Sequence, residues 1–118
     1  MKKNLKNIDF STVLPFVEQT NYLPGQVVSK TLAQNEAVSL TLFAFDKGEE
    51  ISTHASEGDA LVLLLDGAGE VTINNETFQL KTGDSIVMPA GQPHSVYAPE
   101  RFKMFLIVVF PKREENLE

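Results

Sequence analysis

Aliphatic side chains recur at every second position in several stretches after residue 25. Between residues 38 and 45 this alternation has a period of two, which predicts a β-strand. Residues 60–65 are apolar at every position, as expected for a strand buried on both faces inside a sandwich or barrel. Further strands are predicted over 51–54, 70–74, 76–80, 85–88, 94–98 and 101–110.

Turn-forming residues separate the predicted strands. Asn74-Asn75 predicts a tight hairpin turn, because asparagine tolerates a positive φ angle. The sequence Asp-Gly-Ala-Gly at 66–69 predicts a turn between the strands over 60–65 and 70–74. Short strands with frequent turns favour an all-β sandwich or barrel.

The 118 residues suffice for one domain. We predict a barrel over residues 26–111, preceded by an irregular segment, 1–25, that packs on it. A charged tail is expected over 112–118.

The first segment contains several apolar residues between positions 8 and 17. They predict a short helical turn that packs on the body of the barrel. Ser11 or Thr12 is expected to cap this turn, with Pro15 in its first turn.

The last predicted strand is apolar on both faces. One face carries Phe102, Met104, Leu106, Val108 and Phe110, and the other carries Phe105, Ile107 and Val109. Such a strand must be covered twice. Because a small barrel has few elements to spare, we expect a homodimer. The alternative is that the N-terminal segment covers the outer face.

Charge limits the classes of partner. Ten basic and sixteen acidic residues give a net charge of −6. A nucleic-acid partner is not expected, because such binding depends on clustered basic residues. The same charge balance argues against binding to an anionic membrane surface. The longest apolar run, 104–110, is too short to span a membrane. With no pattern typical of a signal peptide, the expected location is the cytoplasm.

The chain has no cysteine and two histidines. The absence of cysteine excludes disulfides, iron–sulfur clusters and thiol nucleophiles. A transition-metal site would have to use both histidines or recruit carboxylates.

Both histidines lie in segments with regularly spaced glycines. Gly48 is followed by five residues and His54, and a further glycine stands at 67. Gly83 is followed by five residues, by Pro-Ala-Gly at 89–91, and then by His94. These segments resemble the two signature motifs of the cupin superfamily, in their order and spacing. The resemblance implies a small single-domain protein of the conserved-barrel type, with a double-stranded β-helix, or jelly-roll, barrel.

The resemblance also implies a divalent transition metal held by three histidines and one glutamate. His54 and His94 occupy two of these ligand positions. Ser56 stands at the second histidine position, and the glutamate position falls on Ala60, or on Leu61 at the longer spacing. The two histidines are therefore candidate metal ligands in an incomplete set.

Two nearby acids, Glu57 and Asp59, offer alternative ligands. We expect Asp59 to accept hydrogen bonds from backbone N–H groups. We expect Glu57 to lie in a turn exposed to solvent, although the turn leaves an inward orientation open.

Strand alternation predicts a mostly apolar pocket with a few polar groups. Its predicted lining residues are His54, Ser56, Ala60, Met88, His94 and Val96. The last strand contributes either Phe102, Met104 and Leu106 or Phe105 and Ile107. This mixture is typical of small-molecule sites. A serine hydrolase is not expected, because no third group is placed to activate Ser56.

The leading hypothesis is a cupin that binds a small molecule in the mouth of its barrel, whether or not it is an enzyme. One alternative is a metal-dependent dioxygenase or isomerase that uses His54 and His94 with an unusual third ligand. The other is a non-catalytic sensor or interaction domain for which the barrel is only a scaffold.

Overall fold

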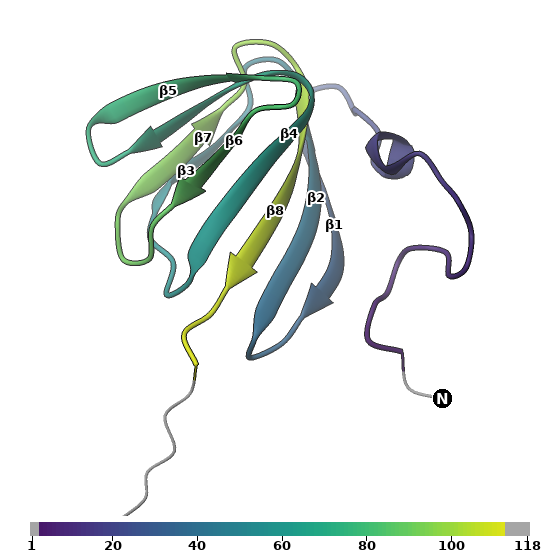
Figure 1. Cartoon of the computed structure of the whole chain (residues 1–118). Helices are drawn as coiled ribbons and strands as arrows, with labels where there is room; N and C mark the ends of the chain where they lie inside the picture. The colour runs from purple at the N-terminus through teal and green to yellow at the C-terminus, as the bar shows by residue number, and fades with distance from the viewer. Residues whose placement is uncertain (1–2, 113–118) are drawn as a thin grey trace, which may run out of the picture.

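The computed structural model describes residues 3–112 of the chain. It contains one 3-10 helix and eight strands, which Figure 1 shows wrapped into a curled sheet. Their bounds are η1 Phe16–Gln19, β1 Val27–Gln34, β2 Val38–Phe45, β3 Glu50–His54, β4 Asp59–Ile73, β5 Glu76–Lys81, β6 Ser85–Met88, β7 His94–Tyr97 and β8 Phe102–Val109. The all-β prediction is confirmed.

All strand pairs are antiparallel, and they form two sheets that share the long strand β4. The first half of β4 pairs with β6 on one side and with β8 on the other, and β8 continues to β2 and β1. The second half of β4 pairs with β5 and β7, and β7 continues to β3. Because the side chains between the two sheets alternate with outward-facing ones, the inner set forms one core.

The turn predicted at 66–69 is wrong, because β4 runs without interruption from Asp59 to Ile73. The chain bends there instead, with an irregularity in the pairing with β8 between Leu64 and Asp66. At the bend, Gly67 has a φ of 86°, and a Cβ atom on it would overlap the carbonyl oxygen of Arg101. The glycine therefore marks a close approach of two backbones inside a strand.

The hairpin predicted at Asn74-Asn75 is confirmed. Ile73 pairs with Glu76 across the two-residue loop, and Asn74 has a φ of 56°. The left-handed conformation at this position is the one that asparagine tolerates.

The N-terminal segment differs from its prediction. The only helical turn among the described residues before β1 is η1, which begins after Pro15, and neither Ser11 nor Thr12 caps it. Residues 3–15 instead lie along the outer side of the barrel. The backbone N–H of Lys6 donates to the carbonyl oxygen of Leu32 at 2.9 Å, so the segment satisfies backbone groups on the barrel in place of its own helix.

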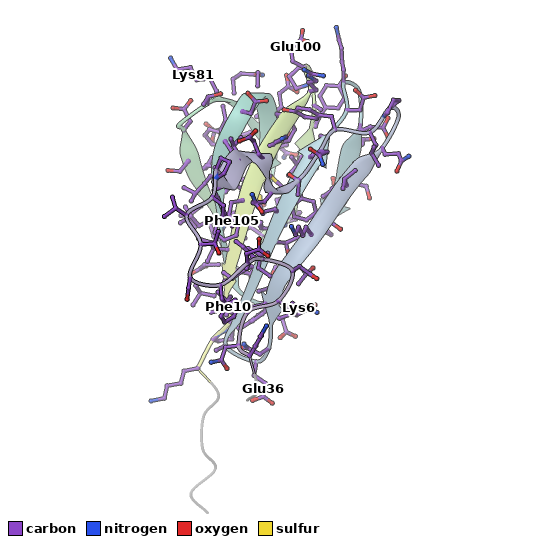
Figure 2. All side chains as sticks on the ribbon, turned by 90° about the vertical axis from the view of Figure 1, so that its right-hand side faces the viewer. Lys6, Phe10, Glu36, Lys81, Glu100 and Phe105 are labelled. Atoms are coloured by element: carbon purple, nitrogen blue, oxygen red, sulfur yellow. The ribbon has the colours of Figure 1, made fainter. Side chains whose placement is uncertain are left out.

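This segment covers part of the outer face of β8. The ring of Phe16 meets that of Phe105 edge to face, with centroids 4.9 Å apart. The ammonium of Lys103, itself buried, donates to the carbonyl oxygen of Val17 at 2.8 Å. Figure 2 looks onto this side and shows the segment crossing the strands near Phe105. Around Phe105, the outer face of β8 is therefore covered by the N-terminal segment, which is the alternative that the sequence left open beside a homodimer.

Of the tail predicted over 112–118, only Lys112 lies among the described residues. Within the described part of the chain, no helix is long and apolar enough to cross a membrane.

Candidate functional site

An irregularity in β3 brings the two histidines together. Ile51 pairs with Val96, and the next pair is His54 with His94. From the first of these pairs to the second there are three residue steps in β3 but only two in β7, so β3 contains one extra residue. An extra residue of this kind reverses the side on which the following side chain points. The bulge therefore turns His54 to the inner side, where His94 also points.

The two imidazoles meet through their Nε2 atoms, which lie 3.2 Å apart. The ring centroids are 4.4 Å apart and the rings are inclined at 73°. Each Nδ1 atom lies close to a backbone carbonyl oxygen two residues earlier. For His54 this oxygen belongs to Ser52, at 2.9 Å, and for His94 to Gln92, at 3.2 Å. Each ring is thus oriented by a carbonyl group of the backbone two residues before it.

The two histidines differ in burial. His94 is 3% exposed, whereas His54 is exposed on the rim. Burial lowers the pKa of His94 below its ordinary value of 6.5, and the neighbouring His54 lowers it further, against a smaller opposite effect of the Gln92 carbonyl. His94 is therefore neutral at pH 7, so one of its ring nitrogens is a hydrogen-bond donor and the other is an acceptor.

A cavity of about 260 Å³ opens beside the pair. It is lined by His54, Ala55, Ser56, Ala60, Met88, His94, Val96, Met104, Leu106 and Val108. The structure thus brings all six residues of the predicted pocket around one hollow.

The sequence left the face of the last strand open, and Val108 was missed as a lining residue. Leu106 pairs with Val62 and Val108 with Ala60, so these side chains share the inner face of the sheet with their β4 neighbours. Once the pairing of β8 with β4 is known, the alternation of side chains along β8 identifies them, because Val108 lies opposite the lining residue Ala60.

No carboxylate lines this cavity among the described residues. Asp59 accepts a hydrogen bond from the backbone N–H of Ala90 at 2.9 Å, which confirms its predicted role. Glu57 is exposed, as predicted. The hydroxyl of Ser56 accepts a hydrogen bond from the backbone N–H of Gly58 at 3.1 Å, and this contact holds it in the turn that follows β3.

The donor set does not fit the four-ligand metal cage that the sequence resemblance implies. Within residues 3–112, no group of three or more His, Cys, Asp or Glu side chains is placed to hold a metal ion. Ser56 and Ala60 line the cavity where the resemblance implies two further ligands. The site therefore offers two imidazole nitrogens as metal ligands, and the rest of the cavity lining is mostly aliphatic.

Comparison with known proteins yields one family and several similar structures. A family model described as a cupin domain matches residues 41–110. A conserved protein of unknown function from Streptococcus pyogenes is 42% identical, with a TM-score of 0.92 and coverage of 95% of this chain and 98% of that one. A cupin superfamily protein from Desulfitobacterium hafniense is 32% identical, with a TM-score of 0.87 and coverage of 92% and 100%. These similarities confirm the jelly-roll barrel.

Among curated proteins, the chain is similar to quercetin 2,3-dioxygenase of Bacillus subtilis. The two are 31% identical over 83 residues, which is 66% of this chain and 25% of that enzyme. This chain thus matches about a quarter of the enzyme's length.

Proposed function

Because this chain belongs to the cupin family, we propose that the open end of its barrel binds a small molecule. The same fold supports many unrelated functions, so the proposal rests on the site rather than on the fold. Catalysis is not part of the proposal.

The observation that carries the proposal is the hollow beside the histidine pair. Ala60 at the mouth is 2% exposed to solvent yet borders this hollow. Aliphatic walls with one cluster of polar atoms are the usual composition of a ligand pocket. At about 260 Å³ the cavity is smaller than most drug-sized sites. It has room for a ligand of about one ring, since an engineered apolar cavity of only about 150 Å³ accepts benzene.

The test is to fill the cavity. Ala60→Phe places a ring where the ligand would lie, and Ala37→Phe adds the same ring to an exposed loop as a matched control. Calorimetric titration with single-ring aromatic compounds is expected to show binding to the wild type and to the control, and none to Ala60→Phe. Absence of binding to the wild type, or equal binding to Ala60→Phe, would contradict the proposal.

A second candidate function is a metal-dependent oxygenase. Its support is the similarity to quercetin 2,3-dioxygenase and the convergence of two Nε2 atoms at 3.2 Å, a separation compatible with bonds of about 2.0–2.1 Å to one ion. Elemental analysis of untagged protein after incubation with iron, manganese, nickel and zinc salts decides it. One equivalent of metal, lost in His94→Ala, favours this candidate, and a substoichiometric content removes it.

A further inference from the structure

The two sheets of the barrel part between β5 and β6. Each of these strands pairs with β4 and, within the described part of the chain, with no other strand. A groove of about 380 Å³ runs along the gap. Its apolar walls come from both sheets and are formed by Ile73, Phe78, Ile86, Val87 and Pro89. Of these, Ile73, Phe78 and Ile86 pack against the core but are only partly buried. The core is therefore incompletely covered on this side.

Among the strands at the edges of the sheets, β6 is the one without charged residues. The edge of β1 is covered by the N-terminal segment, which donates hydrogen bonds to the backbone carbonyls of Thr31 and Leu32. Strands β3 and β5 both contain charged side chains, which keep an edge from pairing with other chains. Strand β6 has the sequence Ser-Ile-Val-Met, and Val87 is 50% exposed. Its free edge can accept a further strand.

The charge around the groove is negative. Glu76 lines the groove, and its carboxylate forms no ion pair with any residue in the range 3–112. Asp84 directly precedes β6, and the whole chain carries a net charge of −6. Basic residues in a partner are therefore favoured at this edge.

The cover of β1 is an example of the chemistry that this barrel accepts at an edge. The backbone N–H of Lys6 and the side-chain amide of Asn7 donate the hydrogen bonds that hold the segment there. Residues 3–15 contain two lysines and a single acid, Asp9, in an otherwise acidic chain. A basic segment with aliphatic side chains is thus already seated on one edge.

We propose that the edge of β6 binds an extended peptide segment of a partner protein, with aliphatic residues at alternate positions and a net positive charge. Main-chain hydrogen bonds to β6 extend the sheet by one strand. Because successive side chains of a strand point to opposite faces, every second side chain enters the groove against Phe78 and Ile86. A basic side chain that flanks this stretch pairs with Glu76.

Fluorescence polarisation of a labelled seven-residue peptide of alternating lysine and valine tests the proposal on the whole chain. Val87→Lys places a cation on the free edge and is expected to weaken binding about tenfold or more. The matched control is Val109→Lys, which adds the same charge at a 55% exposed position on β8, a strand with partners on both sides. The control is expected to keep the wild-type affinity.

The contribution of the carboxylate is tested in the same assay. Glu76→Gln is expected to weaken binding by up to about fivefold, as for an exposed ion pair. Glu50→Gln removes an exposed carboxylate from β3, which is another sheet edge, and is expected to have no effect. Equal affinities of these two variants would overturn the assignment of Glu76.

Pairing through the main chain is tested by two methylated peptides, one with methyl groups on the valine nitrogens and one with them on the lysine nitrogens. Only alternate N–H groups of a strand face its partner, so one of the two peptides is expected to lose binding. Retained binding of both would overturn strand addition. A block peptide of the same composition that binds as tightly would overturn it in favour of charge alone.

Three further outcomes overturn the proposal. No binding of the alternating peptide to folded wild-type protein removes it outright. Equal binding to Val87→Lys and Val109→Lys places the peptide elsewhere. A wild type that sediments as a dimer, with Val87→Lys as a monomer, assigns the edge to a second copy of this chain.

Discussion

The two ends of the barrel are packed in opposite ways. At one end the rings of Phe45 and Phe102 stack with centroids 4.5 Å apart, and both residues are almost fully buried. At the other end Ala60 and Val108 border an open cavity. Phe102 and Val108 belong to the same strand, and six residues separate them by about 20 Å. One strand thus passes from a filled core to a hollow.

The filled end explains stability. Truncating one of its stacked rings removes buried area and leaves a cavity between strands that cannot close on it. Phe102→Ala is expected to lower the free energy of unfolding by about 3–5 kcal/mol, measured by urea denaturation. A loss below about 1 kcal/mol would show that this end is not the main core.

Adding a methyl group at Gly69 tests how tightly the filled end of the barrel is packed. A Cβ atom on Gly69 would lie 3.2 Å from both Leu64 Cδ1 and Phe102 Cζ, so Gly69→Ala is expected to cost about 1–3 kcal/mol through overpacking. The same denaturation experiment measures it. An unchanged stability would mean that the rings at this end can move apart.

A pH change tests the hollow end. Because the pKa of folded His94 lies below its ordinary 6.5, the unfolded chain binds more protons as the pH falls through 6.5. His94 therefore contributes stability that is present above pH 6.5 and is lost as the pH falls toward the folded pKa. Urea denaturation between about pH 7.5 and 5.5 is expected to show this decline, and His94→Gln should flatten it. A wild-type decline that persists in His94→Gln would assign it to other groups.

The smallest effect on stability is expected when a side chain is enlarged at the open end of the barrel. Ala60→Val extends into open space, so the free energy of unfolding is expected to change by less than about 0.5 kcal/mol, in contrast to Gly69→Ala. Binding of single-ring aromatic compounds should nevertheless weaken, because the added methyl groups occupy the cavity. A stability loss as large as that of Gly69→Ala would remove the distinction between the ends.

Much of the fold follows from local pattern. The alternation in 38–45 and the Asn74-Asn75 turn depend on neighbouring residues, and they correctly predict a strand and a hairpin. The predicted turn at 66–69 failed because β4 has partners on both sides of its bend, and long-range pairing overrides a local glycine signal. The short helical turn predicted near the N-terminus forms as η1 and packs on the barrel through Phe16. Its start was misplaced, because it begins after Pro15 and neither Ser11 nor Thr12 caps it.

The candidate site could be predicted in composition but not in geometry. The spacing of glycines around His54 and His94 placed both at one mouth, and strand alternation added Val96. The bulge in β3 could not be foreseen, because an extra residue shows only when the partner strand is known. The face of β8 that lines the cavity was undetermined for the same reason.

The most direct test of the proposed function is whether a small molecule lies beside the two imidazole rings. Side-chain nitrogen NMR of histidine-labelled protein near neutral pH distinguishes Nδ1 from Nε2 in each imidazole. A single-ring aromatic compound that binds the wild type is expected to shift the ring-nitrogen signals of both His54 and His94, because both rings line the hollow. Binding that leaves the signals of both histidines unchanged would contradict the claim that the ligand lies in this hollow.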